Sequence, residues 1–330
     1  MNAHVDWVTP DGGRDEAKRA LDVSGAGSIL VQPLISRIVQ LLTLRHLGVT
    51  STLPRRPGSG PGFYSNRRAA ANTQAAWVAD TEEPVESEGT YTQVTFTYKT
   101  LLGRIKVTRQ LVAKGRTYGD VLATELMGKA EDFRNTLESA SVIGNSAANT
   151  KQIDGLLTLI GTVAPASQTI SNTTATAGDA IYLSKLDATI HAVKGSDNKP
   201  AMRIYASLAG QRRLNAAQQA QRQFIQADYE VDGGFVVVSY EGIPVIQSTG
   251  IPDVLVWNGT DGRITNVTGG ATTALIVVNT EYIFYSELTP MTVAPLAKKS
   301  SQYDEIDLYS DIVLVQDNTL GGAILGGIAP

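Results

Sequence analysis

The sequence predicts an α+β protein organised around one long helix, with strands before it and a mixed helix and strand region after it. Three observations support this fold class. Apolar, β-branched and aromatic residues recur at every second position over 91–99 and 103–111, which predicts two strands joined near Thr100–Gly103. A helix-period apolar series follows them, and short strand-like segments then alternate with two helical ones. The 330 residues, 42% of them hydrophobic, suffice for a sizeable core.

The long helix is predicted over about 118–144. Thr117 and Asp120 form an N-terminal capping pattern, and Gly144 is typical of a helix end. Between them, apolar residues recur at spacings of three and four along one face. The members of this face are Leu122, Leu126, Ala130, Phe133, Leu137 and Ala140. We expect Leu126, Phe133 and Leu137 to be buried.

The segment 51–88, called here the extended loop, precedes the first strand and is split by charge. It contains a Pro- and Gly-rich stretch from Pro54 to Gly62 that can neither continue a helix nor pair as a central strand. Residues 23–79 hold six arginines and no acid, whereas Asp80–Glu88 holds five acids and no base. A loop of this length is usually functional or disordered. Its two charge signs favour docking on a neighbouring copy of the chain, which points to assembly and not to catalysis.

A second region is predicted from about residue 163. It contains helices over 183–194 and 209–225, an acidic loop over Asp228–Gly234, and strands over 202–206, 235–239, 244–247, 254–257, 275–278, 282–285, 291–296 and 306–315. At the other end of the chain, residues 1–27 are polar and glycine-punctuated and are expected to form an extended arm. Residues 29–47 are expected to include a short amphipathic helix.

Several functional classes find no support in the residues. The chain has no cysteine, so it forms no disulfide and offers no thiolate nucleophile or zinc–thiolate site. No signal peptide or apolar run of about 20 residues is visible. The three histidines are far apart, and no nucleophile elbow, phosphate loop or dinucleotide fingerprint is present. We therefore expect a soluble protein made in a cytosol, without metal or cofactor.

One acidic cluster imitates a catalytic site. The carboxylates between Asp304 and Asp311 could serve a soluble hydrolase, but strand alternation puts Glu305 and Asp307 on one face and Ile306 on the other. This pattern favours a charged, exposed strand edge. The arginine pairs of the extended loop could likewise bind phosphates, but no interleaved aromatic residues accompany them. The acids of a neighbouring subunit are the better-matched partner.

The order of the parts resembles the major capsid proteins of tailed bacteriophages, which share the Hong Kong 97-type fold with encapsulin shells. The resemblance spans nearly the whole chain, although each motif alone is weak. The motifs that carry it are Ser24–Pro33, Leu44–Val49, Trp77–Glu82, Phe96–Leu111, Tyr118–Gly144, Asp154–Leu157 and Tyr240–Ile246. They resemble, in turn, the end of the N-terminal arm, the approach to the extended loop, its returning limb, the peripheral strands, the spine helix, the turn after it, and the entry to an axial-domain strand.

This resemblance implies a division of the chain into an N-terminal arm and approach (1–50), the extended loop (51–88), a peripheral domain with the spine helix (89–162), an axial domain (163–287) and returning peripheral strands (288–330). It also implies that the chain is no enzyme. The function would be self-assembly, as pentamers and hexamers, into an icosahedral shell that encloses double-stranded DNA without sequence-specific binding and without a membrane. The protein would be assembled in the host cytoplasm and end in the virion.

Partners follow from the same resemblance. The chain lacks the long helical N-terminal extension that some relatives use as a built-in scaffold, so a separate scaffolding protein is implied, together with a portal and a decoration protein. An encapsulin-type compartment that holds protein cargo is the alternative within the fold. Some relatives also cross-link through a lysine of the extended loop and an asparagine of a neighbour. Pro54–Glu88 has no lysine and Lys298–Ile312 has no asparagine, so we expect a noncovalent shell.

Two sets of residues are predicted to act in assembly. The first set would make contacts between subunits and comprises Arg55, Arg56, Arg67, Arg68, Glu82, Glu83, Lys298, Lys299, Asp304 and Glu305. The second set lies on the acidic loop, which the resemblance puts at the tip of the axial domain near the symmetry axes, and comprises Asp228, Glu230 and Asp232. Like charges crowd at such an axis, so cations or neighbouring arginines would have to offset them.

Overall fold

The structure is a computed structural model that describes residues 48–68, 77–83, 89–115, 121–175, 177–220, 229–231, 235–237, 239–297 and 302–330. The predictions for the N-terminal arm and for the capping pattern at 117–120 lie outside these residues. The chain divides into two compact units. One includes Leu101–Phe133 and Met291–Ser310, and the other comprises Arg45–Thr100, Arg134–Pro290 and Asp311–Pro330.

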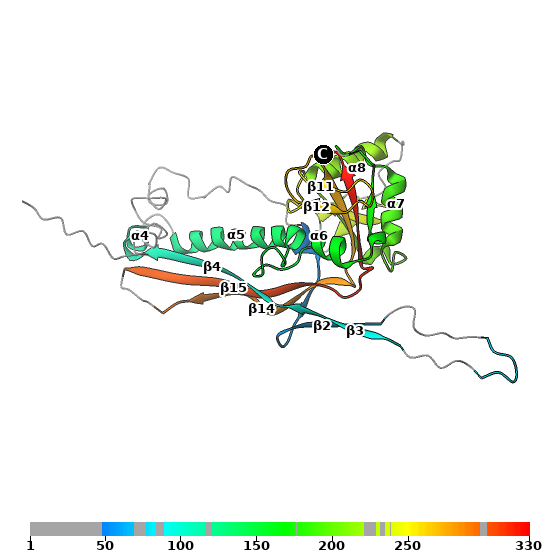
Figure 1. Cartoon of the computed structure of the whole chain (residues 1–330). Helices are drawn as coiled ribbons and strands as arrows, with labels where there is room; N and C mark the ends of the chain where they lie inside the picture. Colours follow the sequence, from blue (N-terminus) through cyan, green and yellow to red (C-terminus); the bar gives the residue numbers. More distant parts are fainter. Residues whose placement is uncertain are drawn as a thin grey trace, which may run out of the picture. The chain divides into compact units, whose positions relative to one another are not determined.

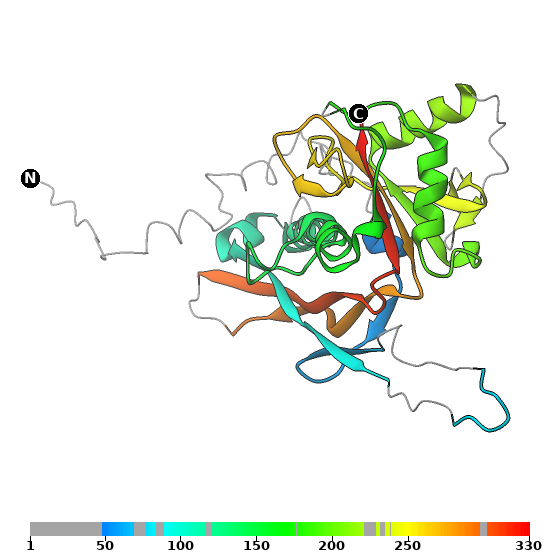
Figure 2. The ribbon, with the colours of Figure 1, turned by 45° about the vertical axis from the view of Figure 1, so that its right-hand side comes forward.

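Along the described chain, four strands come first after a short helix, helices and strands then follow in mixed order, and strands alone make up the last part (Figures 1 and 2). The helical segments are α3 (Gly48–Thr52), α4 (Arg109–Gly115), α5 (Val121–Ile143), α6 (Leu156–Thr158), η1 (Leu159–Val163), η2 (Ala166–Gln168), α7 (Leu183–Ala192), η3 (Lys199–Ala201) and α8 (Leu208–Ala220). The strands that precede α8 are β1 (Arg55–Pro57), β2 (Gly62–Arg68), β3 (Tyr91–Thr97), β4 (Lys99–Thr108), β5 (Thr169–Ser171) and β6 (Met202–Ala206). The later strands are β7 (Tyr229–Val231), β8 (Phe235–Val237), β9 (Ser239–Tyr240), β10 (Ile243–Gln247), β11 (Val256–Trp257), β12 (Ile264–Asn266), β13 (Thr273–Asn279), β14 (Ile283–Pro295), β15 (Tyr303–Gln316) and β16 (Gly322–Ile328).

Two larger sheets and three strand pairs organise these elements. The four-stranded sheet has the order β1-β14-β15-β4, and the six-stranded sheet has the order β5-β16-β13-β6-β10-β9. The pairs are β2 with β3, β7 with β8, and β11 with β12. Pro57 lies in β1, the edge strand of its sheet, where a residue without a backbone N–H is tolerated.

The long helix α5 confirms the predicted spine helix. Phe133 and Leu137 are buried, and Leu126 is half-buried against the cluster that contains Leu111 and Val121. The helix ends before Gly144, where a Cβ atom would lie 2.3 Å from the carbonyl oxygens of Ala140 and Ile153, so the close approach requires glycine. None of the described helices combines the length and the hydropathy that a membrane crossing requires.

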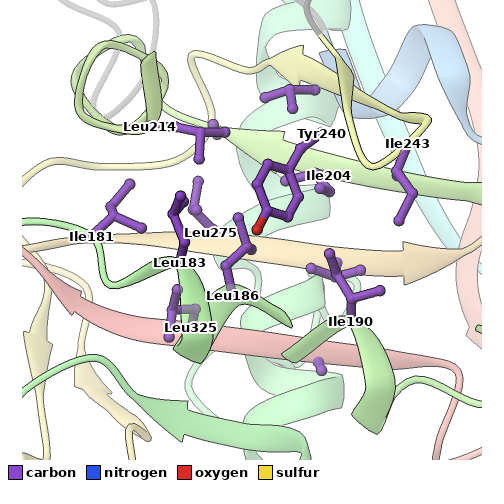
Figure 3. Packing of buried hydrophobic residues seen from close by; sticks show 14 of the residues in the cluster. Ile181, Leu183, Leu186, Ile190, Ile204, Leu214, Tyr240, Ile243, Leu275 and Leu325 are labelled. Atoms are coloured by element: carbon purple, nitrogen blue, oxygen red, sulfur yellow. The ribbon is translucent and has the colours of Figure 1, made fainter. Parts of the chain in front are cut away.

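A large hydrophobic core among the described residues lies on one face of the six-stranded sheet, beneath α7 and α8 (Figure 3). Alternate residues of β6, β13 and β16 point into it, as the two-residue period of a strand requires. Leu186 and Ile190 of α7 and Leu214 of α8 complete the cluster. The residues between them in the strands, such as Ile276 and Ile324, are also fully buried, so the central strands are covered on both faces.

The structure differs from the sequence analysis in which strands pair with one another. The strands near residues 91–111 form β3 and β4, but they are no hairpin: β3 pairs with β2, and β4 belongs to the four-stranded sheet. The extended loop is not structureless either, because it contains β1, β2 and the end of α3. Its β2 pairs over seven positions with β3, which supplies the backbone partners that a free loop would lack.

Two further differences concern the end of the chain and the acidic loop. At the end of the chain, which was expected to form only returning strands, β16 pairs antiparallel with β13 and parallel with β5 in the six-stranded sheet. Its uniformly apolar and small residues suit a strand buried on both faces. The acidic loop begins as a strand, since Tyr229–Val231 pairs with Phe235–Val237. Asp228 and Asp232 lie outside the described residues.

Candidate assembly interface

The β2–β3 ribbon has one face that is anchored to its own unit. The Phe63 ring packs edge-on against Phe284, with ring centroids 5.4 Å apart. Ser65 is buried and donates its hydroxyl to Asp317 Oδ1 over 2.6 Å. Arg67 Nε donates to the Asp317 carbonyl oxygen over 3.0 Å, and its guanidinium also bonds the Gln316 carbonyl. Burial lowers the pKa of Arg67, while the negative charge of Asp317 opposes this shift.

The opposite face of the ribbon is exposed. Tyr64 and Tyr91 are 47% and 70% exposed, and neither belongs to the anchored set because successive side chains of a strand alternate between faces. Between them on this face, Gln93 Nε2 donates to Asn66 Oδ1 over 3.0 Å. Two aromatic rings and a pair of amides thus form an accessible surface on a ribbon of only two strands. Such a ribbon is marginally stable by itself.

The segment 77–83, which was assigned to the returning limb of the extended loop, is exposed throughout. Trp77 is fully exposed, with a relative accessibility of 105%, and Val78 is 45% exposed. A turn follows, in which Glu82 N–H donates to the Ala79 carbonyl over 3.0 Å and Ala79 N–H donates to Glu82 Oε2 over 3.3 Å. Glu83 is exposed beside it. Trp is among the residues enriched at protein interfaces, so the exposed indole is a candidate contact residue.

The loop arginines have partners within their own chain. Arg55 forms an ion pair with Glu287 and lies 5.6 Å from the centre of the Tyr285 ring. Arg56 stacks 3.8 Å from the centre of the Phe284 ring and donates to the Glu281 carbonyl over 3.3 Å. Together with Arg67, these residues hold the beginning of the extended loop on β14 and its neighbours. For Arg68 the backbone alone is described, and Lys298 and Lys299 lie outside the described residues.

The acids of β15 form ion pairs with the adjacent strand β4. Asp307 accepts two hydrogen bonds from Arg104, over 2.7 and 2.9 Å, and this pairing raises the pKa of the arginine. Glu305 pairs with Lys106 over 3.4 Å, and the lysine also lies 4.4 Å from the Tyr303 ring centre. The predicted exposed edge is therefore wrong for Glu305 and Asp307: both carboxylates are largely buried, because cross-strand cations cover them.

Because Glu305 and Asp307 are engaged in ion pairs, the structure does not favour the interpretation of these carboxylates as the catalytic pair of a hydrolase. Asp311 accepts a hydrogen bond from Thr100, and Asp304 is half-buried. Within the described ranges, no cluster of three or more His, Asp or Glu side chains could hold a metal ion. His191 is exposed and bonds the Asp187 carbonyl of its own helix, while His4 and His46 lie outside those ranges.

The sequence analysis missed two acids that organise this region. Asp317 receives both Ser65 and Arg67, and Glu138 lies buried in the spine helix. The sequence held no signal for Glu138, because residue 138 is turned by about 100° from Leu137 and so away from the predicted apolar face. The proximity of Asp228, Glu230 and Asp232 to a symmetry axis stays a prediction. Of these residues, Glu230 lies in β7, where the backbone alone is described.

Comparison with known proteins tests the family. The family model described as "Phage capsid family" matches residues 27–288. No curated protein sequence matches the chain. Among solved structures, the capsid of a native GTA particle is similar with 13% identity and a TM-score of 0.64, covering 93% of this chain and 98% of that one.

Two other solved structures extend the comparison. The capsid of cyanophage A-1(L) is 11% identical, with a TM-score of 0.65 and coverage of 90% and 96%. The SrpI encapsulin of Synechococcus elongatus PCC 7942 is 13% identical, with a TM-score of 0.66 and coverage of 93% and 95%. At such identities the likeness shows the fold, and the family model adds the family. The chain therefore belongs to the phage capsid family and is a capsid shell protein with the Hong Kong 97-type fold.

Proposed function

We propose that copies of this chain assemble, as pentamers and hexamers, into a closed icosahedral shell that encloses double-stranded DNA without reading its sequence. The family match over residues 27–288 is the observation that carries this proposal. Solved capsids that are similar over nine-tenths or more of both chains support it. The shell is assembled in the host cytoplasm, on a separate scaffolding protein and around a portal vertex, and a decoration protein is a further partner.

The exposed parts of the extended loop are the proposed contacts between subunits. Trp77, Tyr64 and Tyr91 offer apolar area that a lone chain leaves in water. Glu82 and Glu83 supply negative charge beside the indole, and Lys298 and Lys299 are their proposed partners on a neighbour. Arg55, Arg56 and Arg67 contribute to these contacts chiefly by anchoring the loop, since their own chain already supplies an acid, aromatic rings and carbonyl groups.

The remaining predicted residues also have proposed roles. Asp304 and Arg68 are proposed to contact a neighbouring subunit, whereas Glu305 is proposed to support such contacts indirectly, by holding Lys106 on β4. Asp228, Glu230 and Asp232 are proposed to surround the symmetry axes. Repetition of each contact around a ring multiplies a pairwise term that is only about 0–1 kcal/mol for exposed ion pairs.

An encapsulin-type compartment is the second candidate. The similarity to the SrpI encapsulin, with a TM-score of 0.66, favours it as much as any capsid comparison favours the first. The two candidates differ in what the shell contains: a phage shell holds DNA behind a portal vertex, and a compartment holds protein cargo.

Electron microscopy of the purified protein, alone and with its scaffolding protein, tests the shell. We expect closed particles of uniform diameter, and particles from a productive infection should carry DNA that nuclease cannot reach. A protein that stays monomeric under all these conditions would overturn the shell. Closed particles without DNA but with a copurifying protein cargo would favour the compartment instead.

A further inference from the structure

Glu138 of the spine helix is a buried carboxylate that links three elements. Only 1% of the residue is exposed. Its Oε1 accepts the Val49 N–H over 3.0 Å and the Ser248 hydroxyl, and its Oε2 accepts the Thr50 N–H over 2.8 Å. All three donors are neutral groups, so these hydrogen bonds stabilise the carboxylate without a paired cation among the described residues.

Two of these donors are backbone groups of α3. Val49 and Thr50 are the second and third residues of that helix, where N–H groups have no partner within the helix itself. Glu138 therefore caps α3 from 88 and 89 residues away in the chain. The helix also lies tightly against β10, because a Cβ on Gly48 would be 2.2 Å from the Gln247 carbonyl oxygen. Little room exists for α3 to shift in this slot.

The chain runs directly from α3 into the extended loop. Leu53 is buried, and the carbonyl oxygen of Pro54 accepts the Tyr285 N–H over 2.9 Å. Residues 55–57 then pair in parallel with β14. The Thr52 hydroxyl adds a bond of 2.7 Å to the Tyr205 hydroxyl. The direction in which the extended loop leaves is thus determined within a few residues of the carboxylate.

We propose that Glu138 is a positioning residue that locks the start of the extended loop to the spine helix and to the turn at Ser248, and thereby determines the geometry with which subunits join. A buried charge is costly, and an apolar residue would fill the same space more cheaply if packing were its only role. The carboxylate instead satisfies donors from two separate elements with its two oxygens. Its effect on shell geometry rests on the proposed function, whereas the lock itself does not.

Glu138→Gln tests the lock while it keeps the size of the side chain. One oxygen becomes an NH₂ group that faces backbone N–H donors, so α3 loses a partner. We expect amide hydrogen exchange in a peptide spanning 48–53 to accelerate by about tenfold or more, which corresponds to about 1.4 kcal/mol. Peptides from β13 should keep their protection, and shells should become heterogeneous in diameter. Glu131→Gln, which removes a carboxylate from the same helix, is the matched control and should behave like the wild type.

The possible outcomes test separately whether Glu138 holds α3 in place and whether this contact affects the geometry of the shell. Wild-type exchange at 48–53 in Glu138→Gln would overturn the lock, and an equal loss of protection in β13 would reduce Glu138 to a general packing residue and overturn the proposal as well. Uniform shells despite a loosened α3 would overturn the effect on geometry. If the wild type forms no shells, the proposed function fails, but the exchange result still decides the lock. Ser248→Ala, which removes one donor and keeps the charge, should give a smaller acceleration in the same peptide if Glu138→Gln does not fold.

Discussion

At the scale of single residues, two buried phenols illustrate how polar groups are accommodated beside Glu138. Tyr205 and Tyr285 are both fully buried, and their hydroxyls bond Thr52 and Ser141 over 2.7 and 2.6 Å. Burial is the main cause that raises the pKa of each phenol well above its ordinary value. Each ring therefore stays neutral in the folded chain and ties a different element to its neighbour.

These shifts predict loss of stability in alkali. An unfolded tyrosine releases its proton near pH 10, whereas the folded chain holds the proton to higher pH. The contribution is therefore fully present below about pH 10 and is lost as the pH rises beyond it. Denaturant unfolding of the wild type between pH 8 and 11 should show this decline. The double variant Tyr205→Phe/Tyr285→Phe should start about 1–3 kcal/mol lower and decline less steeply. Parallel declines in both proteins would contradict the assignment.

The backbone geometry at Glu241 predicts that a substitution there raises the stability of the folded chain. Glu241 has a φ of 51°, and the next residue, Gly242, has a φ of 81°, which is the geometry of a hairpin turn that favours Asn-Gly. Its exposed ion pair with Lys199, at 3.1 Å, is worth about 0–1 kcal/mol. In a Lys199→Ala background, where that pair is absent, Glu241→Asn should raise the free energy of unfolding by ~0.5–1 kcal/mol. A decrease would show that the turn is unstrained.

At the scale of elements, the spine helix is the best-predicted part. Phe133→Ala should lower the free energy of unfolding by ~3–5 kcal/mol, because it removes a buried ring and leaves a cavity. Met127→Ala is the control on the same helix: Met127 is 73% exposed, so its loss should change stability by less than about 0.5 kcal/mol. Equal effects in thermal or denaturant melts would mean that the buried face is assigned wrongly.

The contrast between α5 and the strands explains what the sequence could predict. A helix satisfies its backbone locally, so the apolar period and Gly144 were enough to find α5. A strand needs a partner that periodicity does not name. The segments at β3 and β4 were therefore recognised, but they were paired with each other and not with β2 and β15. The pairing of β16 with β13 was missed for the same reason.

In the candidate interface, too, the sequence shows the residues but does not name their partners. The charge of the extended loop was visible in the sequence, but the in-chain partners of Arg55, Arg67 and Glu305 come from segments about 200 to 250 residues away. Glu138 looks in the sequence like any single carboxylate on a helix, and most such carboxylates are solvated. Long-range contacts of this kind depend on the fold, and the local sequence does not encode them.

At the scale of the whole molecule, the two segments through which some relatives cross-link their subunits lack the lysine and the asparagine that this cross-link needs. The extended loop from Pro54 to Glu88 has no lysine, Lys298–Ile312 has no asparagine, and the sequence has no cysteine. Mature particles boiled in denaturant should therefore migrate as one band near 35.1 kDa. Ladders of higher mass that survive denaturant and reductant would contradict this expectation and would call for a lysine elsewhere in the chain.

In the proposed shell, noncovalent surfaces such as the exposed segment 77–83 of the extended loop hold subunits together, and a variant of Trp77 separates assembly from folding. Because Trp77 is fully exposed, Trp77→Ala should change subunit stability by less than about 0.5 kcal/mol. If the indole packs on a neighbour, its loss should weaken that contact about tenfold or more, or about 1.4 kcal/mol per site. Light scattering and electron microscopy would register this as a higher protein concentration needed for shells.

Phe63→Ala is the matched control for Trp77, since Phe63 packs on Phe284 inside the same subunit. It should lower subunit stability first and affect assembly only as a consequence. Shells that form from Trp77→Ala at the wild-type concentration would exclude the indole from the interface. Among the described residues, the exposed face of the β2–β3 ribbon with Tyr64 and Tyr91 would then be the next candidate contact.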